Sequence, residues 1–146
     1  PPLTVFADSS ALVKRYADEV GADIVRALTV VVVSVIARVE VPAAVWRKHR
    51  SGELSLDDAS VLVEAFEWEW LGGAGTPGRF AIVPLVDTVL ETAARMTGVH
   101  GLRAYDAVQL ASALAARSAD PGIAEVVCFD AELAAAARLE GFGVTP

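Results

Sequence analysis

Short apolar runs alternate with helix-like segments along the whole chain. Four of these runs have the length of a strand and are rich in branched or aromatic residues, which predicts strands buried in a sheet. The predicted strands span residues 3–7, 30–33, 80–85 and 125–129. Strands that alternate with helices favour an α/β fold, a three-layer sandwich in which helices flank a mostly parallel central sheet of four to five strands.

The segments between the predicted strands contain helix start and stop signals. The predicted helices span residues 11–17, 22–28, 35–50, 88–96, 102–117 and 131–139, with a turn at 98–101 and a further helix that begins after Ser55. Ser55 and Asp58 resemble a capping box at the start of that helix. Pro42 should bend the 35–50 helix or mark its true start.

Residues 66–70 alternate between aromatic and acidic side chains, so their period fits a helix or a strand. In a helix, side chains two residues apart do not share a face. At least one of Phe66, Trp68 and Trp70 is then expected at the surface, where it would favour a protein partner. Packing of all three in the core is the alternative.

The composition is that of a folded domain. Hydrophobic residues make up 54% of the 146 residues and charged residues 21%, which excludes a disordered chain. The glycine-rich segment 72–78 is too short to separate domains, so we expect a single domain over residues 1–146. One cysteine excludes an internal disulfide and a Cys-based zinc site. Without a long apolar stretch or a basic leader, we expect a cytoplasmic protein outside the membrane.

The net charge argues against a general nucleic-acid binder. Twelve Lys and Arg residues stand against nineteen Asp and Glu residues, for a net charge of −7. Proteins that bind nucleic acid usually show a basic surface. Binding of RNA by this chain would therefore need a local basic patch or bound cations.

Four acidic residues lie at the ends of predicted elements or among apolar neighbours. Asp8 and Asp130 follow the first and last predicted strands, Asp106 lies near a helix start, and Glu40 has apolar neighbours. Each has an ordinary interpretation: an N-cap for the first two, a helix-dipole contact for Asp106 and an ion pair for Glu40. Together they are expected at one edge of the sheet, where ligands bind in open α/β folds. Clustered carboxylates without His or Cys favour Mg²⁺ or Mn²⁺.

The segments that contain these acids resemble the four motifs of PIN-domain ribonucleases, and more closely those of the VapC toxins of bacterial toxin–antitoxin pairs. The matching segments lie within residues 5–14, 34–47, 102–111 and 129–142. Their order and spacing agree with the family over nearly the whole chain, residues 3–144. Two positions depart from it: Cys128 replaces the usual Thr or Ser and so removes a hydroxyl that could orient a water or support a metal, and Gln109 replaces a common His.

The resemblance implies a metal-dependent endoribonuclease that leaves 5′-phosphate and 3′-hydroxyl ends. Asp8, Glu40 and Asp106 would hold a first Mg²⁺ or Mn²⁺, and Asp130 would complete a second site. One metal would activate a water for attack on phosphorus and the other would neutralise the leaving 3′ oxygen. These four acids are the expected catalytic residues, and Ser9 is expected to donate a hydrogen bond to a ligand carboxylate.

Basic residues near these acids are candidates for RNA contacts. Arg47 lies seven residues after Glu40, two turns along one helix face. The residues predicted to contact phosphates are Lys14, Arg47, Lys48, Arg50 and Arg103. For Lys48 and Arg50, a solvated helix end is the alternative. The resemblance further implies a VapB-type antitoxin, a homodimer, a toxin–antitoxin hetero-oligomer, and tRNA or rRNA as the substrate.

Two functions of other classes stay open at this point. One is a catalytically weak or inactive PIN-like module that binds RNA or protein, which the Cys128 substitution favours. The other is a metal-dependent phosphotransferase acting on small molecules. Cleavage of RNA with and without EDTA distinguishes the enzyme from the binding module.

Overall fold

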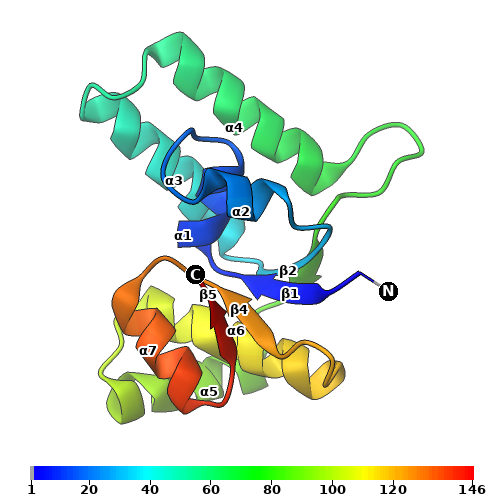
Figure 1. Ribbon diagram of the computed structural model, residues 1–146, viewed down its shortest axis with the longest axis vertical. Coiled ribbons are helices and arrows are strands. Elements are labelled where there is room, and N and C mark those ends of the chain that lie inside the picture. Colours follow the sequence, from blue (N-terminus) through cyan, green and yellow to red (C-terminus); the bar gives the residue numbers. More distant parts are fainter. Residues whose placement is uncertain (1) are drawn as a thin grey trace.

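The structure is a computed structural model that describes residues 2–146, and its centre is one parallel sheet (Figure 1). The strands are β1 (Thr4–Ala7), β2 (Val30–Ser34), β3 (Ala81–Val83), β4 (Glu125–Val127) and β5 (Gly143–Thr145). Their order is β3-β2-β1-β4-β5, and every neighbouring pair is parallel. The predicted sandwich with a parallel sheet is therefore confirmed. β5 was not predicted, because its three residues form no apolar run.

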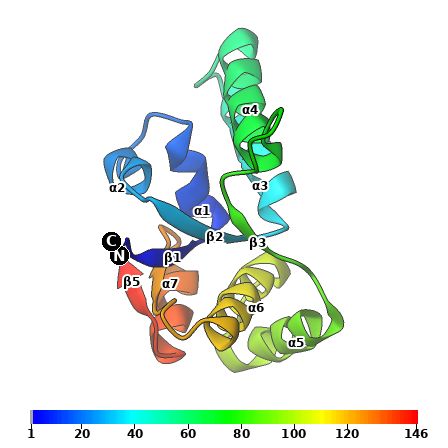
Figure 2. The same cartoon turned by 90° about the vertical axis from the view of Figure 1, so that its right-hand side faces the viewer.

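Helices cover both faces of the sheet, as Figure 2 shows. They are α1 (Ser9–Leu12), the 3-10 turn η1 (Val13–Arg15), α2 (Ala22–Arg26), α3 (Ala37–Arg50), α4 (Leu56–Leu71), α5 (Asp87–His100), α6 (Ala104–Ala119) and α7 (Ala131–Leu139). Helices α1 to α4 lie on one face and α5 to α7 on the other. No helix within residues 2–146 combines the length and the apolar character needed to cross a bilayer.

The side chains of β1 point alternately to the two faces of the sheet and so belong to two separate parts of the core. Val5 and Ala7 pack with the aromatic side chains of α4, whereas Phe6 packs with α5, α6 and α7. Successive side chains of a strand point to opposite faces, so one buried strand supplies both cores. This explains why the central strands are apolar without interruption.

The direction of the chain across the sheet changes at β1. From β1 the chain moves outward through β2 to β3, and it then returns to the other side of β1 as β4 and β5. Ala7 pairs with Val127 in the register, and the Asp8 N–H donates to the Val127 carbonyl oxygen at 3.2 Å. In open α/β sheets, ligands bind at such a switch point, beyond the carboxyl ends of the strands.

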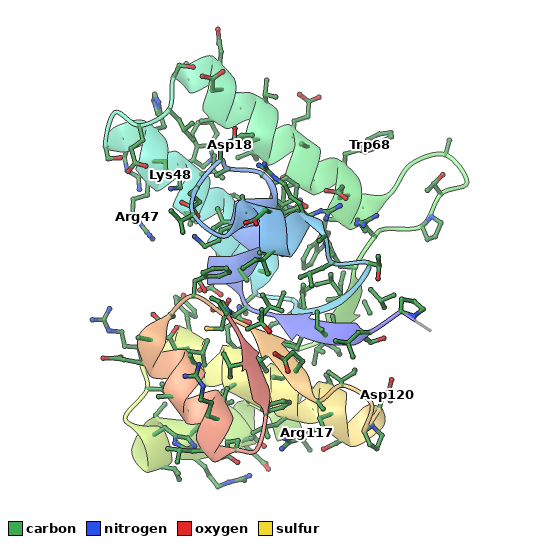
Figure 3. All side chains as sticks on the ribbon, viewed as in Figure 1. Asp18, Arg47, Lys48, Trp68, Arg117 and Asp120 are labelled. Atoms are coloured by element: carbon green, nitrogen blue, oxygen red, sulfur yellow. The ribbon has the colours of Figure 1, made fainter. Side chains whose placement is uncertain are left out.

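Helix α4 resolves the ambiguous aromatic segment. It is helical throughout, with Ser55 as its N-cap: the Ser55 hydroxyl accepts a hydrogen bond from the Asp58 N–H. Phe66 and Trp70 lie four residues apart on the buried face, and Trp68 on the opposite face is 68% exposed. Figure 3 shows Trp68 projecting outward from α4. The expectation that one of these aromatic residues reaches the surface is confirmed.

Most predicted helix bounds differ from the observed ones by a few residues, and two of the differences concern Pro42 and Gly98. Pro42 lies inside α3, which begins at Ala37. The proline therefore does not mark the start of the helix, and it removes one backbone N–H donor from its second turn. Helix α5 continues through the predicted turn at Gly98 and ends at His100. It is followed by Gly101, whose φ of 66° is in the left-handed region that favours glycine.

Candidate active site

A cavity of about 520 Å³ brings the four predicted acids together at the carboxyl ends of β1 and β4. Its walls include the side chains of Asp8, Glu40, Asp106 and Asp130. Asp8 and Asp130 are the N-caps of α1 and α7, and Glu40 and Asp106 lie in the first turns of α3 and α6. Four separate helix starts therefore place one carboxylate each in the same space.

Asp8 is the most buried of the four acids, with 3% of its surface exposed. Its carboxylate accepts hydrogen bonds from the Ala11 N–H at 3.0 Å and from the Ser10 hydroxyl at 2.7 Å. Burial raises the pKa of Asp8 to about 6, because it removes water from the charged form and the hydrogen bonds only partly compensate. Ser10 also accepts from the Phe129 N–H, which ties Asp8 to the end of β4.

Glu40 is held in a small network of polar side chains. Its Oε1 atom accepts hydrogen bonds from the Ser9 hydroxyl at 2.9 Å and from Gln109 Nε2 at 2.8 Å. Gln109 Nε2 also lies 2.8 Å from the Ser9 oxygen. The Glu40 carboxylate can only accept, so it determines which end of the Gln109 amide faces it. This network fixes the position of Glu40 without a basic partner.

Gln109 is a site residue to which the sequence reasoning gave no role. It lies three residues after Asp106, one helical turn along α6, and this spacing was the available signal. Its Oε1 atom is buried and accepts no hydrogen bond from residues 2–146. A buried acceptor beside a cavity is a place for a water or a cation.

Asp106 and Asp130 add negative charge at the same edge. Burial raises the pKa of Asp106, and the negative charges of Asp130 and Glu40 raise it further, while Arg103 acts in the opposite direction. The Asp130 carboxylate accepts a hydrogen bond from the Leu133 N–H at 2.9 Å and so caps α7. Both strand-end aspartates thus act as N-caps as well as lining the cavity. Mutual repulsion of the carboxylates is the cost that a bound dication would relieve.

The donor set of the cavity fits a hard divalent cation. Its acidic groups are carboxylates, and the Gln109 amide oxygen is a further oxygen without a donor among residues 2–146. Within that part of the chain, no three side chains of His, Cys, Asp or Glu converge closely enough to enclose an ion. The fit therefore depends on donor chemistry and on a shared cavity.

Cys128 stands behind Asp8, at the position where a hydroxyl was expected. Its Sγ atom lies 3.4 Å from Asp8 Oδ2 and 3.4 Å from the backbone oxygen of Asp130, so its single S–H can donate to either oxygen. Burial raises the pKa of the Cys128 thiol, and the nearby charge of Asp8 raises it further, so the thiol keeps its proton at neutral pH. The substitution thus preserves a hydrogen-bond donor to Asp8, although a weaker one.

Cations gather on one wall of the cavity. Lys14, Arg47 and Lys48 line it, whereas Arg50 and Arg103 do not. Figure 3 shows Arg47 and Lys48 together near the end of α3. Arg47 forms no ion pair within residues 2–146, so its guanidinium is available to a ligand.

The two lysines share a partner that sequence reasoning missed. Glu19 accepts from Lys14 Nζ at 3.1 Å and from Lys48 Nζ at 2.7 Å. Lys14 Nζ also lies 4.5 Å from the centroid of the Phe129 ring. Glu19 belongs to an irregular segment between η1 and α2, and no local pattern connects it to α3. Only the tertiary structure reveals this contact.

Known proteins resemble this chain both in fold and in sequence. The crystal structure of PAE2754 from Pyrobaculum aerophilum superposes with a TM-score of 0.62 over 97% of this chain and 83% of that chain, at 20% identity. That likeness shows the fold alone, and with the site it defines a PIN-like α/β domain with a carboxylate-lined cavity. No family model matches the sequence.

Two relatives from Mycobacterium tuberculosis are much closer in sequence. They are ribonuclease VapC45 of strain CDC 1551 / Oshkosh and ribonuclease VapC49 of strain ATCC 25618 / H37Rv. Each is 36% identical over an alignment of 147 positions, which covers 97% of this chain and 94% of the relative. The chain belongs to the VapC ribonuclease family.

Proposed function

We propose that this chain is a Mg²⁺- or Mn²⁺-dependent endoribonuclease that acts as the toxin of a toxin–antitoxin pair. The observation that carries the proposal is the single cavity that Asp8, Glu40, Asp106 and Asp130 line in a chain 36% identical to ribonucleases. Membership of the family supports RNA as the substrate. The oxygen-only donor set supports the choice of metal.

The four carboxylates are the proposed metal ligands and catalytic residues. Asp8, Glu40 and Asp106 would hold a first cation, and Asp130 would complete a second site. The chemistry that Mg²⁺ or Mn²⁺ supplies in such sites is activation of water for attack on phosphorus and neutralisation of negative charge on the phosphate.

The surrounding residues hold these carboxylates in place. The Ser9 hydroxyl and the Gln109 amide orient Glu40, each through a hydrogen bond shorter than 3 Å. The Ser10 hydroxyl and the Cys128 thiol donate to Asp8. Such contacts to ligand carboxylates set both their position and their basicity.

The RNA is proposed to lie along the cationic wall of the cavity. Arg47, Lys14 and Lys48 would contact backbone phosphates nearest the carboxylates, because all three line the cavity. Arg50 and Arg103, which lie outside the cavity lining, would contact phosphates farther along the strand. Cleavage by water at phosphorus is proposed to leave 5′-phosphate and 3′-hydroxyl ends.

The test is cleavage of a structured RNA with Mg²⁺, with Mn²⁺ and with EDTA, followed by sequencing of the product ends. We expect cutting that EDTA abolishes and that Asp106→Asn reduces by at least about a hundredfold, a loss of about 3 kcal/mol in transition-state stabilisation. Asp87→Asn is the matched control, because Asp87 is also a first-turn acid but lies on α5, outside the cavity lining.

Three outcomes would overturn the proposal. Tight RNA binding without cutting in either metal would make the chain a PIN-like binding module. Turnover of acyl phosphates or sugar phosphates, with RNA left intact, would make it a small-molecule phosphotransferase. Cutting that survives both EDTA and Asp106→Asn would remove the metal and the carboxylates from the mechanism.

Family membership also supports proposals about partners. A VapB-type antitoxin would hold the chain inactive in a hetero-oligomer, the chain alone would form a homodimer, and tRNA or rRNA would be its target. Sequencing of RNA ends from cells that express the wild type or Asp106→Asn would identify the target, because only the active chain should create new ends. Sedimentation of the purified chain, with and without the antitoxin, measures the assembly.

A further inference from the structure

The Glu19 carboxylate bridges two lysines at the wall of the cavity. Its two oxygens lie 3.1 Å from Lys14 Nζ and 2.7 Å from Lys48 Nζ. The lysines come from separate elements, η1 and α3, and both side chains are largely shielded, with 13% and 21% of their surface exposed. Two ammonium groups therefore converge on one anion beside the proposed catalytic carboxylates.

This contact has the geometry of an anion-binding site. Within residues 2–146, the Glu19 carboxylate has no other hydrogen-bond partner than these lysines. Hydrogen bonds from Lys48 and Lys14 lower the pKa of Glu19 although partial burial opposes them, and Glu19 raises the pKa of Lys48. A carboxylate between two ammonium groups presents a single negative charge and two acceptor oxygens, as a phosphodiester does.

A ligand can also reach the bridge from solvent. Glu19 lies in an irregular segment, and its side chain is 25% exposed. Rotation of one side chain would free both ammonium groups.

We propose that Lys14 and Lys48 form a subsite for one backbone phosphate of the RNA and that Glu19 occupies this subsite until RNA displaces it. The inference rests on the proposed function, because it takes RNA as the ligand of this cavity. Glu19 is then an internal competitor that weakens the binding of RNA. Arg47, which lines the same cavity without an ion pair among residues 2–146, contacts a phosphate in either state.

The experiment compares Glu19→Gln with the wild type in binding a short single-stranded RNA at low salt, by fluorescence anisotropy in EDTA so that no cutting occurs. We expect the variant to bind about three- to tenfold more tightly, because it removes the competitor and a repulsive charge. The dependence of log Kd on log salt should steepen by about 0.7, the value for one added phosphate contact on a single strand.

Two controls separate displacement from a general charge effect. Glu53→Gln removes the same charge from the same cavity. Of the two lysines Glu53 touches only Lys48, at 3.5 Å, and its other oxygen accepts from the Ser51 hydroxyl, so we expect a smaller gain. Lys48→Gln should weaken binding more in the Glu19→Gln background than in the wild type, because only the freed lysine contacts phosphate fully. Thermal unfolding of each variant checks that the fold persists.

The result that overturns the inference is equal or weaker RNA binding by Glu19→Gln, since Glu19 would then only position the lysines. Equal gains from Glu19→Gln and Glu53→Gln would also overturn it, because net charge would explain both. Tighter binding by Glu19→Gln in a chain that never cuts RNA would support the subsite and reject the proposed function. Cutting by the wild type with no gain from Glu19→Gln would do the reverse.

Discussion

Replacing Asp8 with Asn should stabilise the metal-free protein at neutral pH. Asp8 is 3% exposed, and burial raises its pKa from 3.8 to about 6. The fold therefore disfavours the ionised carboxylate relative to the unfolded chain. Asn is neutral and nearly isosteric, and its Oδ1 atom can still accept from the Ala11 N–H that Asp8 caps.

The magnitude follows from the size of the pKa shift. A shift from 3.8 to about 6 is about two units, and one unit corresponds to about 1.4 kcal/mol, so ionised Asp8 costs about 3 kcal/mol of unfolding free energy. Asn also loses an acceptor for Ser10 or Cys128, which costs about 1 kcal/mol. We expect a net gain of about 2 kcal/mol for Asp8→Asn at neutral pH.

The stability gain of Asp8→Asn should depend on pH. Because the folded pKa lies above the unfolded pKa, the cost is absent below pH 3.8, grows as the pH rises through about 6, and is complete above that value. The gain of Asp8→Asn should therefore be full near pH 7.5 and mostly lost near about pH 4.5.

Urea unfolding in EDTA, followed by tryptophan fluorescence, measures these differences. Glu91→Gln is the control, because Glu91 is an exposed acid on α5 outside the cavity lining and should change the unfolding free energy by less than about 0.5 kcal/mol. The reasoning is refuted if Asp8→Asn is no more stable than the wild type near neutral pH. A gain of the same size at both pH values would refute it as well, since ionisation would not be its cause.

Two further predictions concern metal binding and the core. Mg²⁺ at about a hundred times its Kd should raise the unfolding free energy of the wild type by about 2.7 kcal/mol, measured by thermal unfolding. Asp106→Asn should abolish most of this gain. An undiminished gain in the variant would show that Asp106 is not a metal ligand. Phe66→Ala should lower the unfolding free energy, measured in urea, by about 3–5 kcal/mol, because Phe66 is fully buried. Trp68→Ala should lower it by less than about 1 kcal/mol, because Trp68 is 68% exposed. Similar losses for the two variants would contradict the assigned faces of α4.

Local patterns predicted those elements whose buried faces are unambiguous. The apolar run of β2 indicated a strand buried on both faces, and the bounds of α7 agree with the predicted 131–139. Residues 66–70 fit two periods, and their helical state was decided by packing. Phe66 and Trp70 are buried while Trp68 is exposed, whereas in a strand all three side chains would share one face. β5 went unpredicted because it is stabilised by pairing with β4 and not by its own residues.

Some residues of the candidate site could likewise be predicted from local patterns, and others could not. Asp8 and Asp130 could be chosen from the sequence because each follows an apolar strand, and parallel strands end at the same edge of a sheet. The hydrogen bond from Ser9 to Glu40 joins residues 31 positions apart, and the one from Gln109 to Glu40 joins residues 69 positions apart. Contacts between residues so far apart in the sequence produce no local pattern, and the same holds for the contact between Glu19 and Lys48.

By itself, the sequence determined the sandwich class, the family resemblance and the four acids, because strand runs, caps and strand-end aspartates are local in the chain. The tertiary structure decided how deeply those acids are buried and which residues are their neighbours. It buried Asp8, put Gln109 beside Glu40, brought the Cys128 thiol within 3.4 Å of Asp8, and set Glu19 between two lysines. Burial and electrostatic coupling depend on which distant segments share a cavity, and the folded arrangement of the sheet and its helices sets this.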